Sequence, residues 1–82
     1  MPKAAVDPRY EQLREMLIAA RLEKKLTQIE LAEKLAKHQV WVSRYESSNR
    51  KLDVIEFLDI AKAIGVDPCR LLRKLAAGSP AH

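Results

Sequence analysis

The sequence predicts an all-α protein that folds as one compact domain of five helices. Its 82 residues allow one modest core, and helices build such a core economically because each pairs its own backbone polar groups. Only two glycines and four prolines are present, and helix-forming residues dominate the composition. Apolar residues recur at helical spacing in five segments, and helix-capping signals precede most of them.

The first helix is expected to begin at Pro8, with Asp7 as its N-cap. Residues 1–6 are small and unpatterned, which predicts a flexible N-terminal arm. The helix should continue to about residue 24. Its apolar stripe consists of Tyr10, Leu13, Met16, Leu17, Ala20 and Leu22.

The second helix is expected to begin at Gln28, because Thr27 and Glu30 form a capping-box pattern. Its predicted buried face is Ile29, Leu31, Ala32 and Leu35. Residues 36–38 predict a tight turn. A third helix should then run from about residue 39 to residue 47, with Val42 and Tyr45 facing inward.

The fourth helix should follow Asp53, which takes the capping role with Glu56 three residues later, and Gly65 should end it. Its predicted apolar face is Ile55, Phe57, Leu58, Ala61 and Ile64. A fifth helix is expected after Asp67, with Leu71, Leu72 and Leu75 as its apolar residues. The folded domain is thus expected to span residues 7–76, and residues 77–82 should form a disordered tail.

The outer face of the third helix has an unusual composition. On a helical wheel it collects Gln39, Val40, Ser43, Arg44 and Ser47, and it contains no acidic residue. A solvated face in this chain would mix Glu and Lys, whereas Gln, Ser, Arg and a small apolar group are the types that contact base edges in the major groove. This face is therefore predicted to meet DNA.

The segment from Leu26 to Gly65 closely resembles the Cro/repressor-type (Xre-like) helix-turn-helix family. The matching residues are Leu26-Thr27-Gln28, Glu30-Leu31-Ala32, Gln39, Val42-Ser43, Glu46 and Leu52-Asp53-Val54-Ile55-Glu56-Phe57-Leu58. With the first helix included, the resemblance covers roughly residues 9–75. It implies a five-helix repressor-like domain in which helices 2 and 3 form the helix-turn-helix. It also implies a sequence-specific transcriptional regulator, most simply a repressor, that binds a two-fold operator in double-stranded DNA as a homodimer.

By position, the resemblance implies a role for each of several residues. Those expected to face bases are Gln39, Val40, Ser43 and Arg44. Those expected to hold phosphates are Gln28, Ser47, Asn49, Arg50 and Lys51. Arg21 is expected to form a buried structural ion pair with Glu46, because a carboxylate on the core face of the third helix needs a partner.

The sequence departs from the family pattern at three positions. Ala36 and Ser48 stand where the family usually has glycine, and both residues are penalised by a positive φ angle, which glycine is not. His38 stands where a Ser or Thr cap is commoner. The angle of the third helix could therefore differ slightly from that of its relatives.

Several functions and locations are disfavoured by the composition. The chain lacks a paired-carboxylate cleft, a glycine-rich phosphate loop and a Cys/His cluster, so no enzyme, cofactor or metal is expected. Cys69 is a single cysteine and cannot form an internal disulfide. No apolar run is long enough for a membrane span and no signal peptide is recognised, so a cytoplasmic location is expected. The net charge of +4 favours a polyanionic partner.

Three questions remain open at the level of sequence. Trp41 could pack against sugar-phosphate or cover the turn and the fourth helix. Leu72 and Leu75 are the candidate dimer interface, and the loop at residues 48–52 is the alternative. The alternative function is a protein-interaction module, such as the antitoxin of a toxin-antitoxin pair.

Overall fold

The computed structural model describes residues 7–47 and 50–78, and within these ranges it contains five helices and no strand. The helices are α1 (Pro8–Glu23), α2 (Gln28–Leu35), α3 (Gln39–Glu46), α4 (Val54–Ile64) and α5 (Pro68–Ala77). This confirms the predicted all-α, five-helix class. The expected arm at residues 1–6, tail residues 79–82, Ser48 and the predicted phosphate contact Asn49 lie outside the described residues.

The predicted helix starts are confirmed by their caps. The side chains of Asp7 and Asp67 accept hydrogen bonds from backbone N–H groups two residues later. Thr27 forms a reciprocal capping box with Glu30, and Asp53 forms one with Glu56. Each box satisfies backbone donors that the first turn of a helix leaves without an intrahelical partner.

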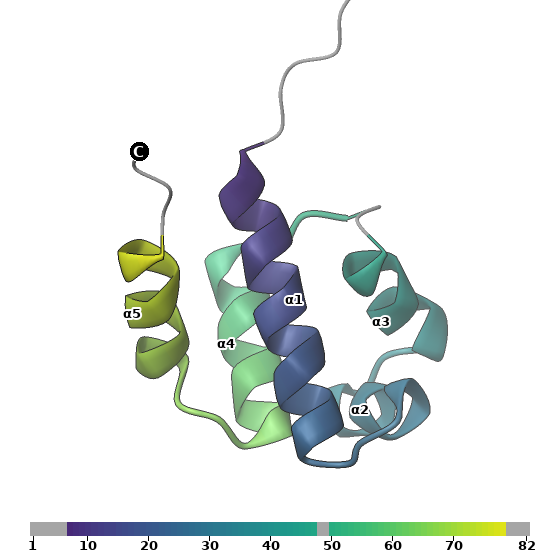
Figure 1. Cartoon of the computed structure of the whole chain (residues 1–82). Coiled ribbons are helices and arrows are strands. Elements are labelled where there is room, and N and C mark those ends of the chain that lie inside the picture. Colours follow the sequence, from purple (N-terminus) through teal and green to yellow (C-terminus); the bar gives the residue numbers. More distant parts are fainter. Residues whose placement is uncertain (1–6, 48–49, 79–82) are drawn as a thin grey trace, which may run out of the picture.

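The five helices pack around one core. α1 lies in the middle of the molecule with α4 behind it, while α2 and α3 lie on one side and α5 on the other (Figure 1). α2 contacts both α3 and α4, and α5 packs against α1 and α4. The largest fully buried side chains at the centre are Leu17, Leu31, Val42, Tyr45 and Ile60. No helix of the described part is both long and apolar enough to cross a lipid bilayer.

Part of the predicted core is wrong. Ile29 is 56% exposed and Ile55 is 64% exposed, although both were expected inside. Leu58 is also exposed, while Ile60, which the prediction omitted, is fully buried. The reason in α4 is geometric, because its buried residues follow the i, i+3, i+4, i+7 spacing of one helical face and are Phe57, Ile60, Ala61 and Ile64.

The same comparison applies to the last helix. In α5 only Leu71 is buried, Leu75 is half-buried, and Leu72 is exposed. Leu72 follows Leu71 by 100° around the helix axis, so it falls outside the face with which α5 packs on α1 and α4.

The turn between α2 and α3 has the left-handed conformation that is expected at a position where the family usually has glycine. Ala36 has φ 56° and ψ 40°, which is left-handed, and the Lys37 N–H donates to the Ala32 carbonyl oxygen across it at 2.9 Å. Lys25, between α1 and α2, also has a positive φ of 60°, which the sequence did not indicate. Both turns thus place side-chain-bearing residues in a region that costs L-amino acids energy.

Ala36→Gly is expected to raise the free energy of unfolding by about 0.5–1 kcal/mol, because the relief of the left-handed strain exceeds the added freedom of the unfolded chain. The measurement is urea unfolding followed by circular dichroism. Ala19→Gly, at an exposed position inside α1, is the matched control and should lower stability by about 1 kcal/mol. A lower urea midpoint for Ala36→Gly would contradict the strain argument.

Candidate nucleic-acid interface

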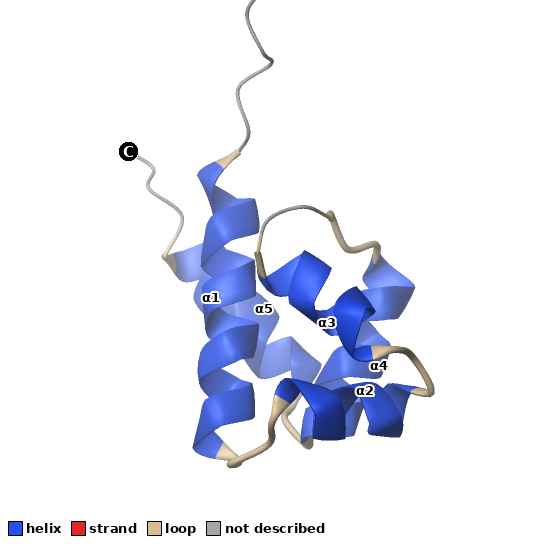
Figure 2. Cartoon of the chain, turned by 90° about the vertical axis from the view of Figure 1, so that its right-hand side faces the viewer, coloured by secondary structure: helices blue, strands red, loops and turns tan. Residues whose placement is uncertain are grey.

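The outward face of α3 is polar and free of carboxylates within the described residues. Gln39, Val40 and Arg44 are exposed, and Ser43 is half-buried. The one acid of α3, Glu46, is turned inward, and its side chain is only 6% exposed. α3 faces the viewer in Figure 2, with α2 below it. A negatively charged surface would be repelled by phosphate, and the outward face of α3 carries no negative charge.

Arg21 and Glu46 form the predicted ion pair beneath this face. Arg21 Nε donates to Glu46 Oε2 at 2.8 Å, and Nη2 donates to Oε1 at 3.0 Å. Nη1 donates to the carbonyl oxygen of Leu26 at 2.8 Å. The planar guanidinium therefore joins α1, the α1–α2 turn and α3 through a bidentate pair that is almost completely buried.

A chain of hydrogen bonds leads from this ion pair to the surface. Gln28 Nε2 donates to Glu46 Oε1 at 2.9 Å, and Gln28 Oε1 accepts from Gln39 Nε2 at 2.9 Å. One amide thus spans from a buried carboxylate to the first residue of α3. The second Nε2–H of Gln39 and its Oε1 have no hydrogen bond within the described chain, so both are available to an external partner.

This chain of bonds was not foreseen from the sequence. The sequence places Gln28 and Gln39 at the starts of two helices and predicts a phosphate contact for one and base contacts for the other, with no link between them. The structure brings these two helix starts together, so the two amides are bonded to each other. They lie eleven positions apart, and sequence spacing across a turn gives no signal for such a contact.

The loop after α3 is held by aromatic and charged contacts. The Trp41 ring packs on the core and meets Tyr45 edge-on, with ring centroids 5.5 Å apart. The Arg50 guanidinium carbon lies 5.3 Å from the Trp41 centroid, and its Nη2 is bonded to Glu56. Lys51 is exposed, with its Nζ 5.0 Å from the centroid of the Tyr10 ring. Trp41 therefore covers the core while supporting a cation beside α3.

The predicted phosphate contact Ser47 and the cap position His38 lie at the two ends of α3. Ser47 is the exposed C-cap, and its hydroxyl donates to the Arg44 carbonyl oxygen at 3.2 Å. His38 occupies the N-cap position but makes no side-chain capping bond, which agrees with its being a poor substitute for Ser or Thr.

Tyr45 anchors α3 from inside. Burial raises the pKa of its phenol above the ordinary value, and the neighbouring Glu46 charge adds to this effect while Arg21 opposes it. Its hydroxyl has no hydrogen-bond partner among the described residues. The phenol therefore stays neutral at physiological pH and serves as a packing group.

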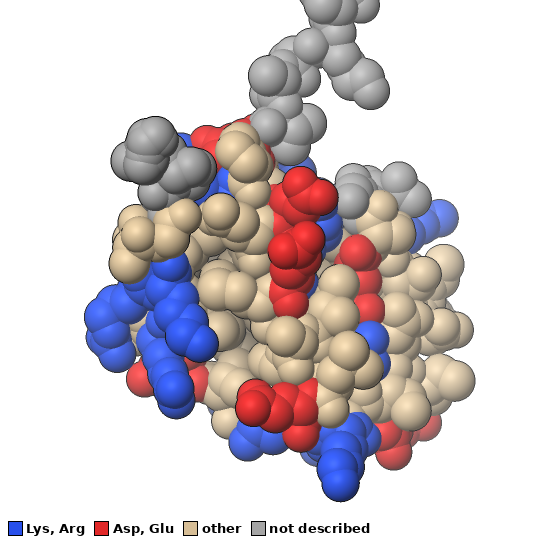
Figure 3. Space-filling view, in the orientation of Figure 1, with Lys and Arg blue, Asp and Glu red and all other residues tan. Residues whose placement is uncertain are grey.

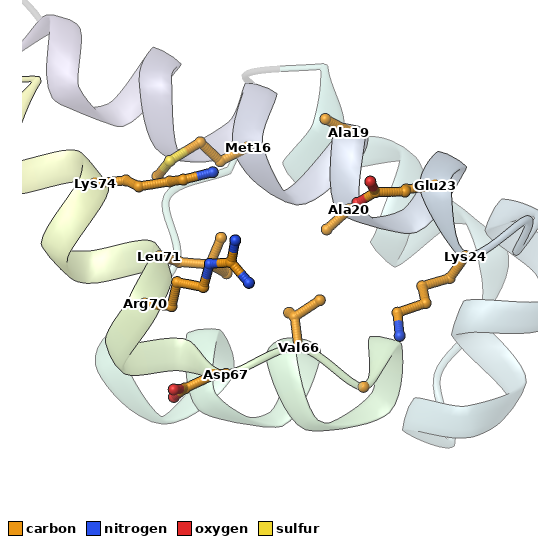
Figure 4. Close-up of a pocket in the computed structure, with 11 residues that line it drawn as sticks. Met16, Ala19, Ala20, Glu23, Lys24, Val66, Asp67, Arg70, Leu71 and Lys74 are labelled. Carbon is orange, nitrogen blue, oxygen red and sulfur yellow. The ribbon is translucent and has the colours of Figure 1, made fainter.

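Charge is distributed unevenly over the molecule. In Figure 3 the basic side chains of α5 form a band on the left, acidic side chains lie over α1, and the right-hand edge, where α3 lies, is mostly uncharged. A groove of about 630 Å³ separates α1 from α5, and Figure 4 shows Arg70 and Lys74 reaching into it from α5. Lys24 lies at the end of the groove near Gly65. The groove is on the α5 side of the molecule, away from α3, and is not part of the candidate interface.

Comparisons with known proteins agree with this geometry. A helix-turn-helix family model matches residues 17–71. No curated protein matches the chain significantly. A solved structure of an XRE-family like protein from Pseudomonas syringae pv. tomato str. DC3000 is 47% identical, covers 88% of each chain and has a TM-score of 0.84.

Two other solved structures share the fold at lower identity. A point mutant of the restriction-modification controller protein C.Esp1396I is 25% identical, with 84% of this chain and 92% of that chain covered and a TM-score of 0.77. The clp gene regulator ClgR from C. glutamicum is 22% identical, with coverage of 90% and 96% and a TM-score of 0.77, which supports the fold alone. The family match and the 47% identical structure show that the chain belongs to the Xre-type helix-turn-helix family of DNA-binding transcriptional regulators.

Proposed function

We propose that the chain is a sequence-specific repressor that places α3 in the major groove of a two-fold operator. The observation that carries the proposal is the hydrogen-bonded path from the buried Arg21–Glu46 pair through Gln28 to Gln39. It fixes the start of α3 before any ligand arrives, and preorganised donors lose less entropy on binding. The residues proposed to face bases are Gln39, Val40, Ser43 and Arg44.

The proposed phosphate contacts surround this face. Gln28 begins α2, where backbone N–H groups and the helix dipole favour an anion. Lys51 is exposed beyond the other end of α3. Arg50 is shared with Trp41 and Glu56, so we expect it to contribute less than a free arginine. The full proposed set is Gln28, Ser47, Asn49, Arg50 and Lys51.

We also propose that the regulator acts as a homodimer. One small domain contacts few base pairs, and specific recognition of a two-fold operator requires two recognition helices about one helical turn apart. Leu72 and Leu75 were the candidate contact. They belong to α5, which Figures 1 and 2 place on the far side of the molecule from α3.

The proposal is tested by the salt dependence of DNA binding. An operator is first selected from a random duplex library, and its affinity is then measured by fluorescence anisotropy over a range of salt concentrations. Each neutralised phosphate should contribute about −0.9 to the slope of log affinity against log salt. Lys51→Ala should reduce the magnitude of this slope by about 0.9 per subunit that makes the contact.

Arg73→Ala is the matched control, because it removes one positive charge from α5 on the side away from α3. It should leave the slope nearly unchanged. Binding that is absent at low salt, or that does not depend on salt, would contradict the proposed function. An equal reduction of the slope in both variants would mean that DNA does not bind specifically at the α3 face.

A further inference from the structure

Three large apolar side chains are exposed together at the start of α4. Val54 is 70% exposed, Ile55 is 64% exposed and Leu58 is 39% exposed. We call these three residues the α4 patch. Single exposed apolar residues are ordinary, but three within five consecutive positions on one helix mark a surface that becomes covered. None of the three belongs to the core, because α4 packs against the core with its other side.

α4, which carries the α4 patch, lies beside the candidate DNA-binding face (Figure 2). α1, α2 and α5 contact the other sides of α4, so its exposed side faces outward. In Figure 2, α3 faces the viewer, α1 lies on the left, α2 below and α5 behind, so the side of α4 that α1, α2 and α5 leave uncovered is the right-hand side. A second copy placed beyond that edge, and related by a two-fold axis pointing at the viewer, would also present its α3 to the viewer.

The α5 surface gives a different result. α5 lies behind the other helices in Figure 2, on the side opposite α3. Two copies joined back to back through α5 would turn their α3 helices away from each other. Such a dimer could not place both recognition helices on one face of a duplex.

The distribution of charge also favours the α4 patch over α5 as a contact between two copies. α5 carries Arg70, Arg73 and Lys74 and no acidic residue, so a two-fold contact would bring the cations of one copy only toward cations of the other. The exposed side of α4 carries both Asp59 and Lys62, so each sign can meet its opposite on the second copy. Asp53 and Asp59 also disfavour DNA as the occupant, because carboxylates repel phosphate.

From these observations we infer that the α4 patch is the contact surface between two copies of this chain, and that it sets the spacing of the two α3 helices. The inference rests on the proposed two-fold mode of DNA binding. The three apolar residues form the centre of the contact. A standard interface buries about 800 Å² on each partner, so a polar rim including Asp59 and Lys62 completes it.

The test is sedimentation equilibrium of the full chain over micromolar concentrations, without DNA. Ile55→Glu should raise the dimer dissociation constant at least tenfold, because it places two carboxylates at the centre of the contact. Glutamate in the first turn of a helix is favourable, so the thermal midpoint of the monomer, measured well below the dissociation constant of the dimer, should not fall. Leu72→Glu makes the same change at an exposed leucine of α5 and should leave dissociation unchanged.

The selected operator gives a second readout. On a single half-site, Ile55→Glu should bind as the unaltered chain does, while on the two-fold site it should lose the gain from pairing. A monomeric unaltered chain, a dimer insensitive to Ile55→Glu, or a dimer broken by Leu72→Glu alone would overturn the inference. If Ile55→Glu breaks a dimer that binds no DNA, the contact surface stands and the proposed function fails.

Discussion

Arg21→Ala is expected to lower the free energy of unfolding by about 3–5 kcal/mol. The substitution leaves Glu46 almost buried without the bidentate partner that neutralises it, and removes the donor to the Leu26 carbonyl oxygen. Gln28 still donates to Glu46, but an amide carries no compensating charge. A domain of this size has a total stability on the order of 5–15 kcal/mol, so the loss should be evident in guanidinium chloride unfolding.

Two further variants test whether the loss of stability comes from leaving a buried charge without its partner. Arg9 pairs with Asp7 at the exposed start of α1, and Arg9→Ala should leave the unfolding midpoint almost unchanged, as is usual for a surface pair. The double variant Arg21→Met with Glu46→Leu should recover much of the lost stability, because no charge is then stranded. An unchanged midpoint for Arg21→Ala would mean that the pair contributes nothing to the fold.

The helix boundaries were predictable because their causes are local. Thr27 and Glu30, or Asp53 and Glu56, satisfy backbone groups within one turn, so the residues that begin a helix can be recognised without its neighbours. The Arg21–Glu46 pair was predictable for a related reason. A carboxylate on the inner side of a helix has to find a cation, and the family resemblance indicated which one.

The exposed residues could not be assigned in the same way. Whether Ile29 or Ile55 is buried depends on how the helices pack, and both are apolar residues in a first turn. An apolar stripe that is wider than the contact it makes leaves one edge exposed, and sequence alone does not say which edge. The contact of Arg50 with Trp41 and the bond between Gln28 and Gln39 likewise depend on tertiary placement.

Arg44→Ala and Gln39→Ala are each expected to cost about 1–3 kcal/mol of binding to the selected operator and to relax the preference at one base position per half-site. Arg44 is exposed and long enough to bond guanine O6 and N7 in a bidentate pair. Gln39, at the start of α3, suits adenine N6 and N7 through the amide atoms that Gln28 leaves free. The measurement is the affinity of each variant for every single-base change of the operator.

Gln28→Ala separates reading from positioning. Loss of a phosphate contact should weaken binding to all sequences about equally, because phosphate carries no base identity. Gln28 also holds the Gln39 amide, so Gln28→Ala should blunt the preference at the Gln39 position and leave the Arg44 position intact. In double-mutant cycles, Gln28 and Gln39 should therefore couple, while Gln28 and Arg44 should be additive within about 0.5 kcal/mol. If Arg44→Ala and Gln39→Ala lower affinity uniformly and Gln28→Ala alone changes base preference at both positions, the reading and positioning roles are reversed.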